Sequence, residues 1–229
     1  MKQGYKSETI LHYVNRMHAT IALIAENLDV YHVVISKGNK KVGHVFNVST
    51  APVLTCDGVC AECSKFCYDI KACLAYPSVM RARAINTAIL WYDPDRYWTE
   101  IDSFLSRYHG KYRNFRYHVG GEVRDLEYFD RMMYSAMSHS DWTMWTYTKR
   151  YDTAYRWQRM NHQPVNFAVM YSEWRGRSMF NPLHKPEFRV LFDGEEAPAG
   201  AYICPGNCEK CLHDHRGCVA GETVYARIH

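Results

Sequence analysis

Eight of the nine cysteines in this chain fall into two compact groups, and this grouping constrains the fold more than any other feature. The first group is Cys56-x3-Cys60-x2-Cys63-x3-Cys67, and the second is Cys204-x3-Cys208-x2-Cys211-x6-Cys218. Thiols that recur at such short intervals can converge on one point, as soft metal ions and iron–sulfur clusters require. The sequence therefore predicts a cysteine-ligated metal centre at each group.

The rest of the composition fits one globular domain in a reducing compartment. The chain has 229 residues, 47% of them hydrophobic, and contains no recognisable interdomain linker. Its formal charge of +4 permits an anionic substrate but does not indicate a nucleic-acid partner, which stays open. The apolar run from Ile21 to Ala25 is too short for a signal sequence or a membrane span. We therefore expect a cytoplasmic protein without a membrane partner, whose clustered cysteines bind metal rather than form disulfides.

Hydrophobic periodicity predicts the elements of the first half. A helix is expected from Ser7, which would act as its N-cap, with apolar residues at three- and four-residue intervals up to Leu28. Strands are expected over residues 31–36 and 45–54, and the second delivers the chain into the first cysteine group. Two helices, over 78–91 and 98–108, are separated by the breaker Tyr92-Asp93-Pro94-Asp95.

Strands and helices alternate in the second half. Strands are expected over residues 115–119, 142–148, 165–171, 188–192, 202–204 and 223–228, with helices after an Asp125 cap and over 153–160. This alternation is typical of a parallel sheet with right-handed crossovers. The predicted fold class is α/β, a small incomplete (β/α) barrel in a single domain. Residues 1–43 would form an N-terminal helix and lead-in, 44–195 the partial barrel core, and 196–229 a cysteine-rich metal-binding extension.

The spacing of Cys56, Cys60 and Cys63 resembles that of the radical S-adenosylmethionine (radical SAM) superfamily. There, three cysteines hold three irons of a 4Fe-4S cluster, and the fourth iron binds SAM. Gly120-Gly121-Glu122 follows a predicted strand, where a Gly-Gly-Glu of the superfamily contacts the SAM amino group. The resemblance implies a barrel of radical-SAM type that cleaves SAM to a 5′-deoxyadenosyl radical, with a reductant such as flavodoxin or ferredoxin.

A closer resemblance is to a small phage-associated family called gene product 88, whose members look like compact radical-SAM-type proteins. The residues that carry it are Lys37 to Gly43, Cys56 to Tyr68, Tyr76 to Val79 with Arg81 and Asn86, Phe115 to Glu122, Tyr147-Thr148-Lys149, and Cys204 to Cys218 with the terminal His229. The resemblance implies a fold and a cluster, and it leaves the substrate unnamed.

The first cysteine group departs from the superfamily pattern at one position. The residue before the third cysteine is commonly aromatic, whereas Glu62 stands there, and the aromatic–cysteine pair is Phe66-Cys67. Cys60, Cys63 and Cys67 are therefore an alternative ligand set. If all four cysteines bind, no iron is left for SAM, and the centre is structural or electron-transferring.

The second cysteine group lies among turn-forming residues, Pro205-Gly206-Asn207 and Asp214 to Gly217, which suit a small loop nucleated by its metal. An auxiliary, fully ligated 4Fe-4S cluster and a structural zinc both fit this group. His118 and Lys149 are added to the cofactor-binding candidates because both fall at predicted strand ends, where barrel proteins gather ligand contacts.

Three functional hypotheses follow from these patterns. The first is a radical SAM enzyme with one or two 4Fe-4S clusters, acting on an unknown substrate. The second is a non-catalytic or electron-transfer 4Fe-4S protein on the same fold. The third is a zinc-dependent nucleic-acid-binding module, which two four-cysteine groups, positive charge and abundant aromatic residues would fit. The alternation of strands and helices argues against the third hypothesis, because zinc modules do not need it.

Overall fold

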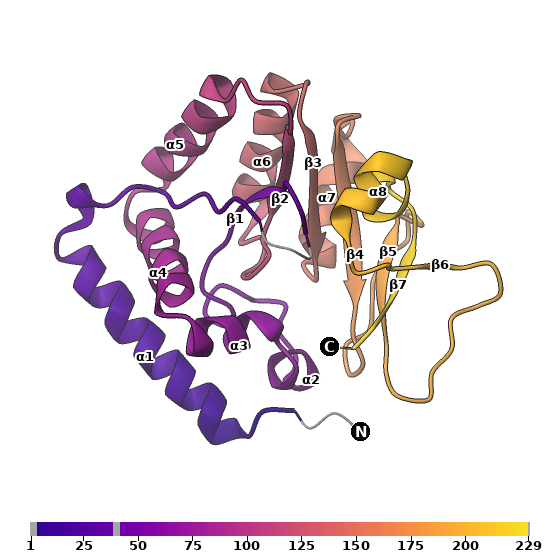
Figure 1. The fold of residues 1–229 in the computed structure, drawn as a ribbon, viewed down its shortest axis with the longest axis horizontal. Helices are drawn as coiled ribbons and strands as arrows, with labels where there is room; N and C mark the ends of the chain where they lie inside the picture. Colours follow the sequence, from indigo (N-terminus) through magenta and orange to yellow (C-terminus); the bar gives the residue numbers. More distant parts are fainter. Residues whose placement is uncertain (1–3, 39–41, 229) are drawn as a thin grey trace.

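The chain folds around an open parallel β-sheet that is covered by helices (Figure 1). The computed structural model describes residues 4–38 and 42–228. The seven strands run in the order β1-β2-β3-β4-β5-β7-β6, and every neighbouring pair is parallel. The predicted α/β class is thus confirmed, and the described sheet does not close on itself.

Most elements overlap the segments that the hydrophobic pattern predicted, but the strand expected over residues 45–54 covers only Phe46–Val48, and the short helices over residues 61–65 and 68–75 were not predicted. The strands are β1 (Phe46–Val48), β2 (Asn114–Tyr117), β3 (Thr143–Thr148), β4 (Phe167–Glu173), β5 (Glu187–Leu191), β6 (Tyr202–Ile203) and β7 (Val224–Arg227). The helices are α1 (Ser7–Ala25), α2 (Ala61–Lys65), α3 (Tyr68–Ala75), α4 (Pro77–Tyr92), α5 (Pro94–Arg107), α6 (Leu126–Ser138), α7 (Tyr151–Met160) and α8 (Cys208–Asp214), with short 3-10 turns η1 (Leu28–Val30) and η2 (Gly217–Ala220).

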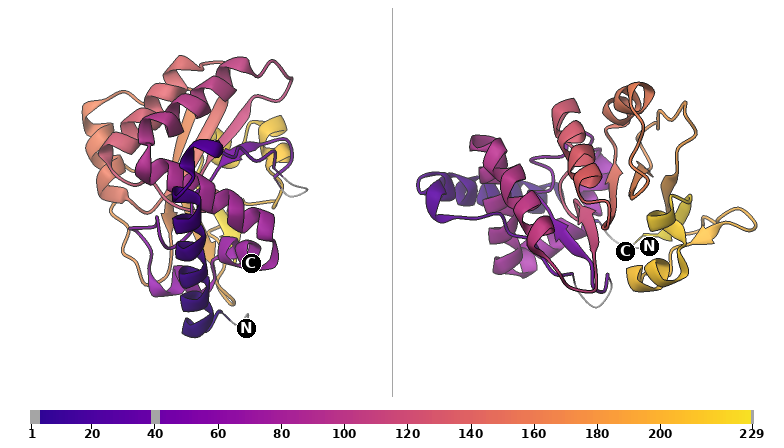
Figure 2. Two further views of the ribbon diagram at one scale, coloured as in Figure 1. Left: turned by 90° about the vertical axis from the view of Figure 1, so that its left-hand side faces the viewer. Right: turned by 90° about the horizontal axis from the view of Figure 1, so that it is seen from above.

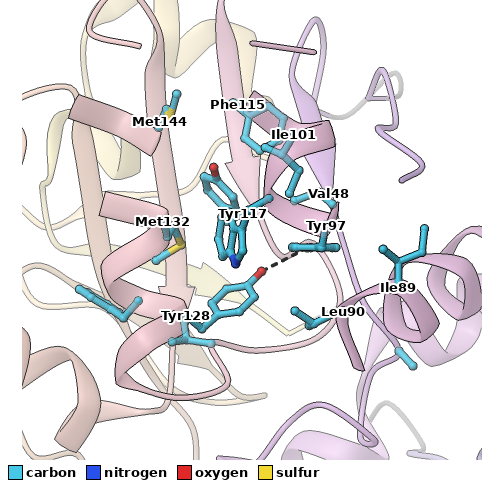
Figure 3. Packing of buried hydrophobic residues seen from close by; sticks show 14 of the residues in the cluster. Val48, Ile89, Leu90, Tyr97, Ile101, Phe115, Tyr117, Tyr128, Met132 and Met144 are labelled. Atoms are coloured by element: carbon cyan, nitrogen blue, oxygen red, sulfur yellow. Dashed lines mark hydrogen bonds between the residues drawn. The ribbon is translucent and has the colours of Figure 1, made fainter. Parts of the chain in front are cut away.

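The two faces of the sheet are covered differently. Helices α4, α5, α6 and α7 pack on one face, and α1 packs on α4, whereas α8 lies on the opposite face (Figures 1 and 2). The main core lies on the first face, where Phe115 and Tyr117 of β2 meet Tyr97 and Tyr128 from the helices (Figure 3). Because side chains alternate along a strand, Arg116 points to the second face.

Two local predictions about the N-terminal region are wrong. Lys6, not Ser7, is the N-cap residue of α1, and its side chain makes no capping bond. Residues 31–36 form no strand beyond a single antiparallel bridge from Ser36. The backbone N–H groups there donate to side chains instead: that of Val33 to the Glu100 carboxylate at 2.6 Å, and that of Val34 to the Asn86 amide oxygen at 2.7 Å. Since these groups have side-chain acceptors, no strand pairing is needed to satisfy them.

The cysteine-rich extension predicted over residues 196–229 belongs to the sheet. It supplies β6 and β7, and β7 lies between β5 and β6, so the extension continues the sheet rather than forming a separate module. Its 3-10 turn η2 packs against β3 and β4 on the second face. Among the described helices none combines the length and apolar character that a membrane crossing requires.

Candidate metal centres

The first cysteine group forms the loop that follows β1, at the edge of the sheet where the parallel strands end. The loop is partly helical. Cys60 is the N-cap of α2, and its sulfur accepts a hydrogen bond from the backbone N–H of Cys63 at 3.4 Å. The Cys60 thiol also donates to the carbonyl of Arg175, in the loop after β4, at 3.7 Å. These contacts hold the loop against the ends of the neighbouring strands.

The thiols of this group lie in a partly buried environment with charged neighbours. Burial raises the pKa of Cys56, and the nearby Glu122 carboxylate and Cys67 raise it further. Burial raises the pKa of Cys67 to about 12. The pKa of Cys63 is also raised by burial, although the ammonium group of Lys149 opposes that shift. Without metal, the thiols of Cys56, Cys63 and Cys67 are therefore protonated at neutral pH, and metal binding would have to displace their protons.

Gly120-Gly121-Glu122 forms the turn after β2, the strand that pairs with β1, so it lies at the same edge as the cysteine loop. A side chain at position 120 would collide with the Asp69 carboxylate, and one at position 121 with the Thr50 hydroxyl. Gly121 also has a φ of +90°, which L-residues rarely adopt. Packing within the protein therefore already requires glycine at both positions. Their contact with a ligand stays a prediction.

Glu122 and Lys149 are joined by a backbone hydrogen bond. The two Glu122 carboxylate oxygens accept separately, one from the N–H of Val123 at 2.8 Å and one from the N–H of Lys149 at 2.7 Å. Glu122 is buried, and burial raises its pKa, while Lys149 lowers it. The Lys149 ammonium lies over the Trp174 ring, 5.7 Å from its centroid. The structure therefore brings both predicted site residues next to Cys56 and Cys63.

His118, also predicted as a ligand contact, sits in an unusual conformation. Its φ is +60°, its side chain is only 3% exposed, and neither ring nitrogen has a hydrogen-bond partner among the described residues. Its ring packs beside that of Tyr128, with the centroids 5.4 Å apart. Burial, assisted by the charge of Arg116, lowers the pKa of His118 from 6.5 to about 3. The imidazole is therefore neutral.

A buried ion pair supports the first site and was not predicted from the sequence. Nε and Nη2 of Arg83, on α4, donate to the Asp69 carboxylate at 3.0 and 3.1 Å, and both side chains are almost fully buried. Asp69 belongs to α3 and touches Gly120, so the pair ties the cysteine loop to the glycine turn. Nothing in the spacing of two residues on separate helices reveals such a contact.

The second cysteine group surrounds a small cavity on the second face of the sheet. The cavity has a volume of about 30 Å³ and is lined by Cys204, Cys208, Cys211, Cys218, Trp145, Tyr147, Tyr202, Asn207, Val219 and Val224. Asn207 caps α8 through two backbone N–H groups, and the Tyr202 hydroxyl lies 3.3 Å from the Cys211 sulfur. The four cysteines therefore line one cavity, and a metal bound there stays a prediction.

Neither group holds a preformed ion site. Across residues 4–38 and 42–228, no three His, Cys, Asp or Glu side chains are gathered closely enough to hold one metal ion. Metal binding would draw the thiols together from their present positions. What the structure offers is the donor set: four cysteines from one loop at the strand ends, and four more around one cavity.

The fold and these sites define an open parallel α/β protein, with one cysteine group at the carboxyl ends of its strands and another on the second face of its sheet. Residues 32–187 match the Gene product 88 family, and because the match covers more than half of the 229 residues, the chain belongs to that family. The matched region includes the first cysteine group and ends before the second. Of the segments that carry the resemblance, residues 39–41 and His229 lie outside the described part. No curated protein and no solved structure matches the chain.

Proposed function

We propose that the chain is a radical SAM enzyme whose 4Fe-4S cluster is held by Cys56, Cys60 and Cys63. The observation that carries the proposal is the meeting of two loops: the cysteine loop after β1 and Gly120-Gly121-Glu122 after β2 emerge from adjacent parallel strands. The Glu122 carboxylate is close enough to Cys56 to raise the pKa of its thiol. A cofactor bound at the cysteine loop would therefore lie within reach of Glu122, on a fold that we expect to be an incomplete barrel of radical-SAM type.

The chain's own residues have distinct roles in this proposal. A cluster with one iron free of protein thiolate would supply the electron that cleaves SAM to methionine and a 5′-deoxyadenosyl radical, and flavodoxin or ferredoxin would provide that electron. The Glu122 carboxylate accepts two backbone N–H groups and also interacts with the Thr148 hydroxyl; a carboxylate has about four acceptor sites, so capacity is left for an ammonium donor. The Lys149 cation beside Cys63 offsets the negative charge of the thiolates.

Cys67 supports a second candidate function, an electron-transfer or structural 4Fe-4S protein. Its thiol is close enough to those of Cys56 and Cys63 to interact with both: Cys67 raises the pKa of Cys56, and Cys63 raises the pKa of Cys67. If Cys67 is the fourth ligand, every iron has a protein thiolate and SAM finds no open position. The two functions thus differ in one testable ligand.

The deciding experiment starts from anaerobic purification and measurement of iron, sulfide and zinc. The EPR spectrum of the reduced protein is then recorded with and without SAM. A spectrum that changes on SAM addition supports an open cluster. An iron–sulfur signal that ignores SAM favours the electron-transfer protein, and a colourless protein that carries only zinc would revive the nucleic-acid-binding hypothesis.

Single variants assign the ligands. Serine in place of Cys56, Cys60 or Cys63 should remove the SAM-responsive signal, whereas Cys67→Ser should keep it. The matched control is Cys73→Ala, because Cys73 is buried in the main core and belongs to neither group. Loss of the SAM response in Cys67→Ser, with retention in Cys56→Ser, would move the cluster to the alternative ligand set of Cys60, Cys63 and Cys67.

A further inference from the structure

The second face of the sheet carries two buried N–H donors without acceptors. Trp145 is 1% exposed and lines the cavity of the C-terminal cysteines, and its Nε1–H has no hydrogen-bond partner among the described residues. The Nε–H of Arg116, on the neighbouring strand β2, is likewise buried and unpartnered there. Buried polar groups nearly always have partners, because leaving one unpaired costs about 1–3 kcal/mol. Two such donors beside the same group of cysteines suggest that a bound group supplies their acceptors.

Arg116 also has no counter-ion among the described residues. In the described part of the chain it makes no ion pair, and its one hydrogen bond is a long one of 3.5 Å from Nη2 to the His118 carbonyl. Its guanidinium lies over the ring of Tyr147, 4.4 Å from the centroid, and Tyr147 lines the same cavity. Its acidic neighbours include the thiols of Cys208 and Cys218. The geometry therefore places a cation beside the cavity of the C-terminal cysteines, with no carboxylate partner among the described residues.

A four-thiolate metal centre supplies both the missing charge and the missing acceptors. Zinc with four cysteines and an oxidised 4Fe-4S cluster with four cysteines each carry a net charge of about −2. Sulfurs in such centres accept N–H hydrogen bonds, and these bonds help to set the reduction potential of a cluster. The charge argument is the same for both metals, so the experiment decides between them.

We propose that the four C-terminal cysteines form one fully ligated metal–thiolate centre on the second face of the sheet. Arg116 is its counter-charge, and Trp145 Nε1–H donates a hydrogen bond to one of its sulfurs. Arg116 and Trp145 are positioning residues that belong to β2 and β3, not to the extension. The centre therefore links the extension to the body of the fold. This proposal does not depend on the chemistry at the first cysteine group.

The test uses the full chain, and in parallel a variant in which Cys56, Cys60, Cys63 and Cys67 are replaced by serine, so that metal can bind only at the second group. In both, Trp145→Phe removes the donor while keeping an aromatic ring, and Arg116→Gln removes the charge. Trp142→Phe is the control for Trp145, because Trp142 is equally buried but packs in the main core on the other face. Arg113→Gln, at a residue paired with Asp141, is the control for Arg116.

The readouts are bound metal per chain and its behaviour. If zinc is bound, Arg116→Gln and Trp145→Phe should each weaken zinc affinity by about 10–100-fold in a chelator competition, as loss of partners beyond the metal ligands does. If a cluster is bound, both substitutions should lower its midpoint potential, because a positive charge and a hydrogen bond no longer stabilise the reduced state. The two controls should leave either quantity unchanged.

The outcomes separate this inference from the proposed enzyme. Absence of metal at the second group in the full chain would overturn it, and so would Arg116→Gln and Trp145→Phe variants that match their controls. A full chain that shows no SAM response, but whose second group binds metal with this dependence on Arg116 and Trp145, would refute the proposed enzyme and sustain the inference. If the serine variant does not fold, the comparison in the full chain still decides, with the ligand substitution Cys218→Ser marking which metal belongs to the second group.

Discussion

Mild acid should destabilise this protein through His118. The imidazole is buried, and both Arg116 and Arg83 lower its pKa in addition to burial, from 6.5 to about 3. The unfolded chain therefore takes up a proton near pH 6.5, while the folded chain does so only near pH 3. Because the unfolded state binds more protons in this window, the free energy of unfolding falls as the pH drops from 6.5 towards 3, with a slope that approaches about 1.4 kcal/mol per pH unit.

The contribution of His118 is measured by comparison with His118→Asn, which cannot titrate and suits the positive φ of this position. Urea unfolding of both proteins is followed by tryptophan fluorescence at about pH 7.5 and about pH 5.5. Between these values the wild type should lose about 1.4 kcal/mol more stability than the variant, from the linkage of a group with the stated pKa values. Other titrating groups are common to both proteins and cancel in the difference. Equal losses would refute the reasoning and mean that His118 can be protonated in the folded state.

Three further perturbations test the packing around the first site. Arg83→Met leaves the buried Asp69 carboxylate without its partner, so the free energy of unfolding should fall by about 3–5 kcal/mol; an unchanged urea midpoint would contradict a buried pair. Gly121→Ala should cost clearly more stability than Gly200→Ala, because both positions have a positive φ but only position 121 is crowded; equal costs would leave the conformational strain alone as the cause. Asp125→Ala removes the N-cap of α6 and should lower the thermal midpoint, at a cost of about 1 kcal/mol; no change would show that another group caps the helix.

The parts of the fold that could be predicted are those in which one repeating pattern decides the structure. The three- and four-residue spacing of Met17, Ile21 and Ile24 places all three on the buried side of α1. Asp125 was expected to cap a helix, and its carboxylate accepts the N–H of Tyr128 at 2.8 Å. The prediction of a strand over residues 31–36 was wrong because composition does not reveal that side chains of α4 and α5 accept the hydrogen bonds of its backbone N–H groups. The insertion of β7 between β5 and β6 also has no local signal.

The candidate sites were predictable to the extent that they depend on local sequence. Cysteine spacing marked both groups, and the strand pattern placed the first group and Gly120-Gly121-Glu122 at the same edge of the sheet. The supporting residues were not predictable. The contacts that matter join residues far apart in the sequence, as they do for Arg83, Arg116 and Trp145. From the sequence alone, an arginine is expected to be a surface charge and a tryptophan a core residue. Only the three-dimensional arrangement separates a cation with a carboxylate partner from one without.

The position of the extension gives its metal a structural consequence. Side chains of β3 and β4 that point away from the main helices, Trp145 and Ala168, are buried against Cys208, Leu212 and the segment around η2. That segment has few other apolar residues, so its folding depends on what joins its four cysteines. A metal that binds the folded extension and not the unfolded chain stabilises this packing by mass action. Removing the metal should therefore loosen the packing over Trp145 first. The core between the sheet and helices α4 to α7 should stay intact, because none of the described residues buried in it comes from the extension.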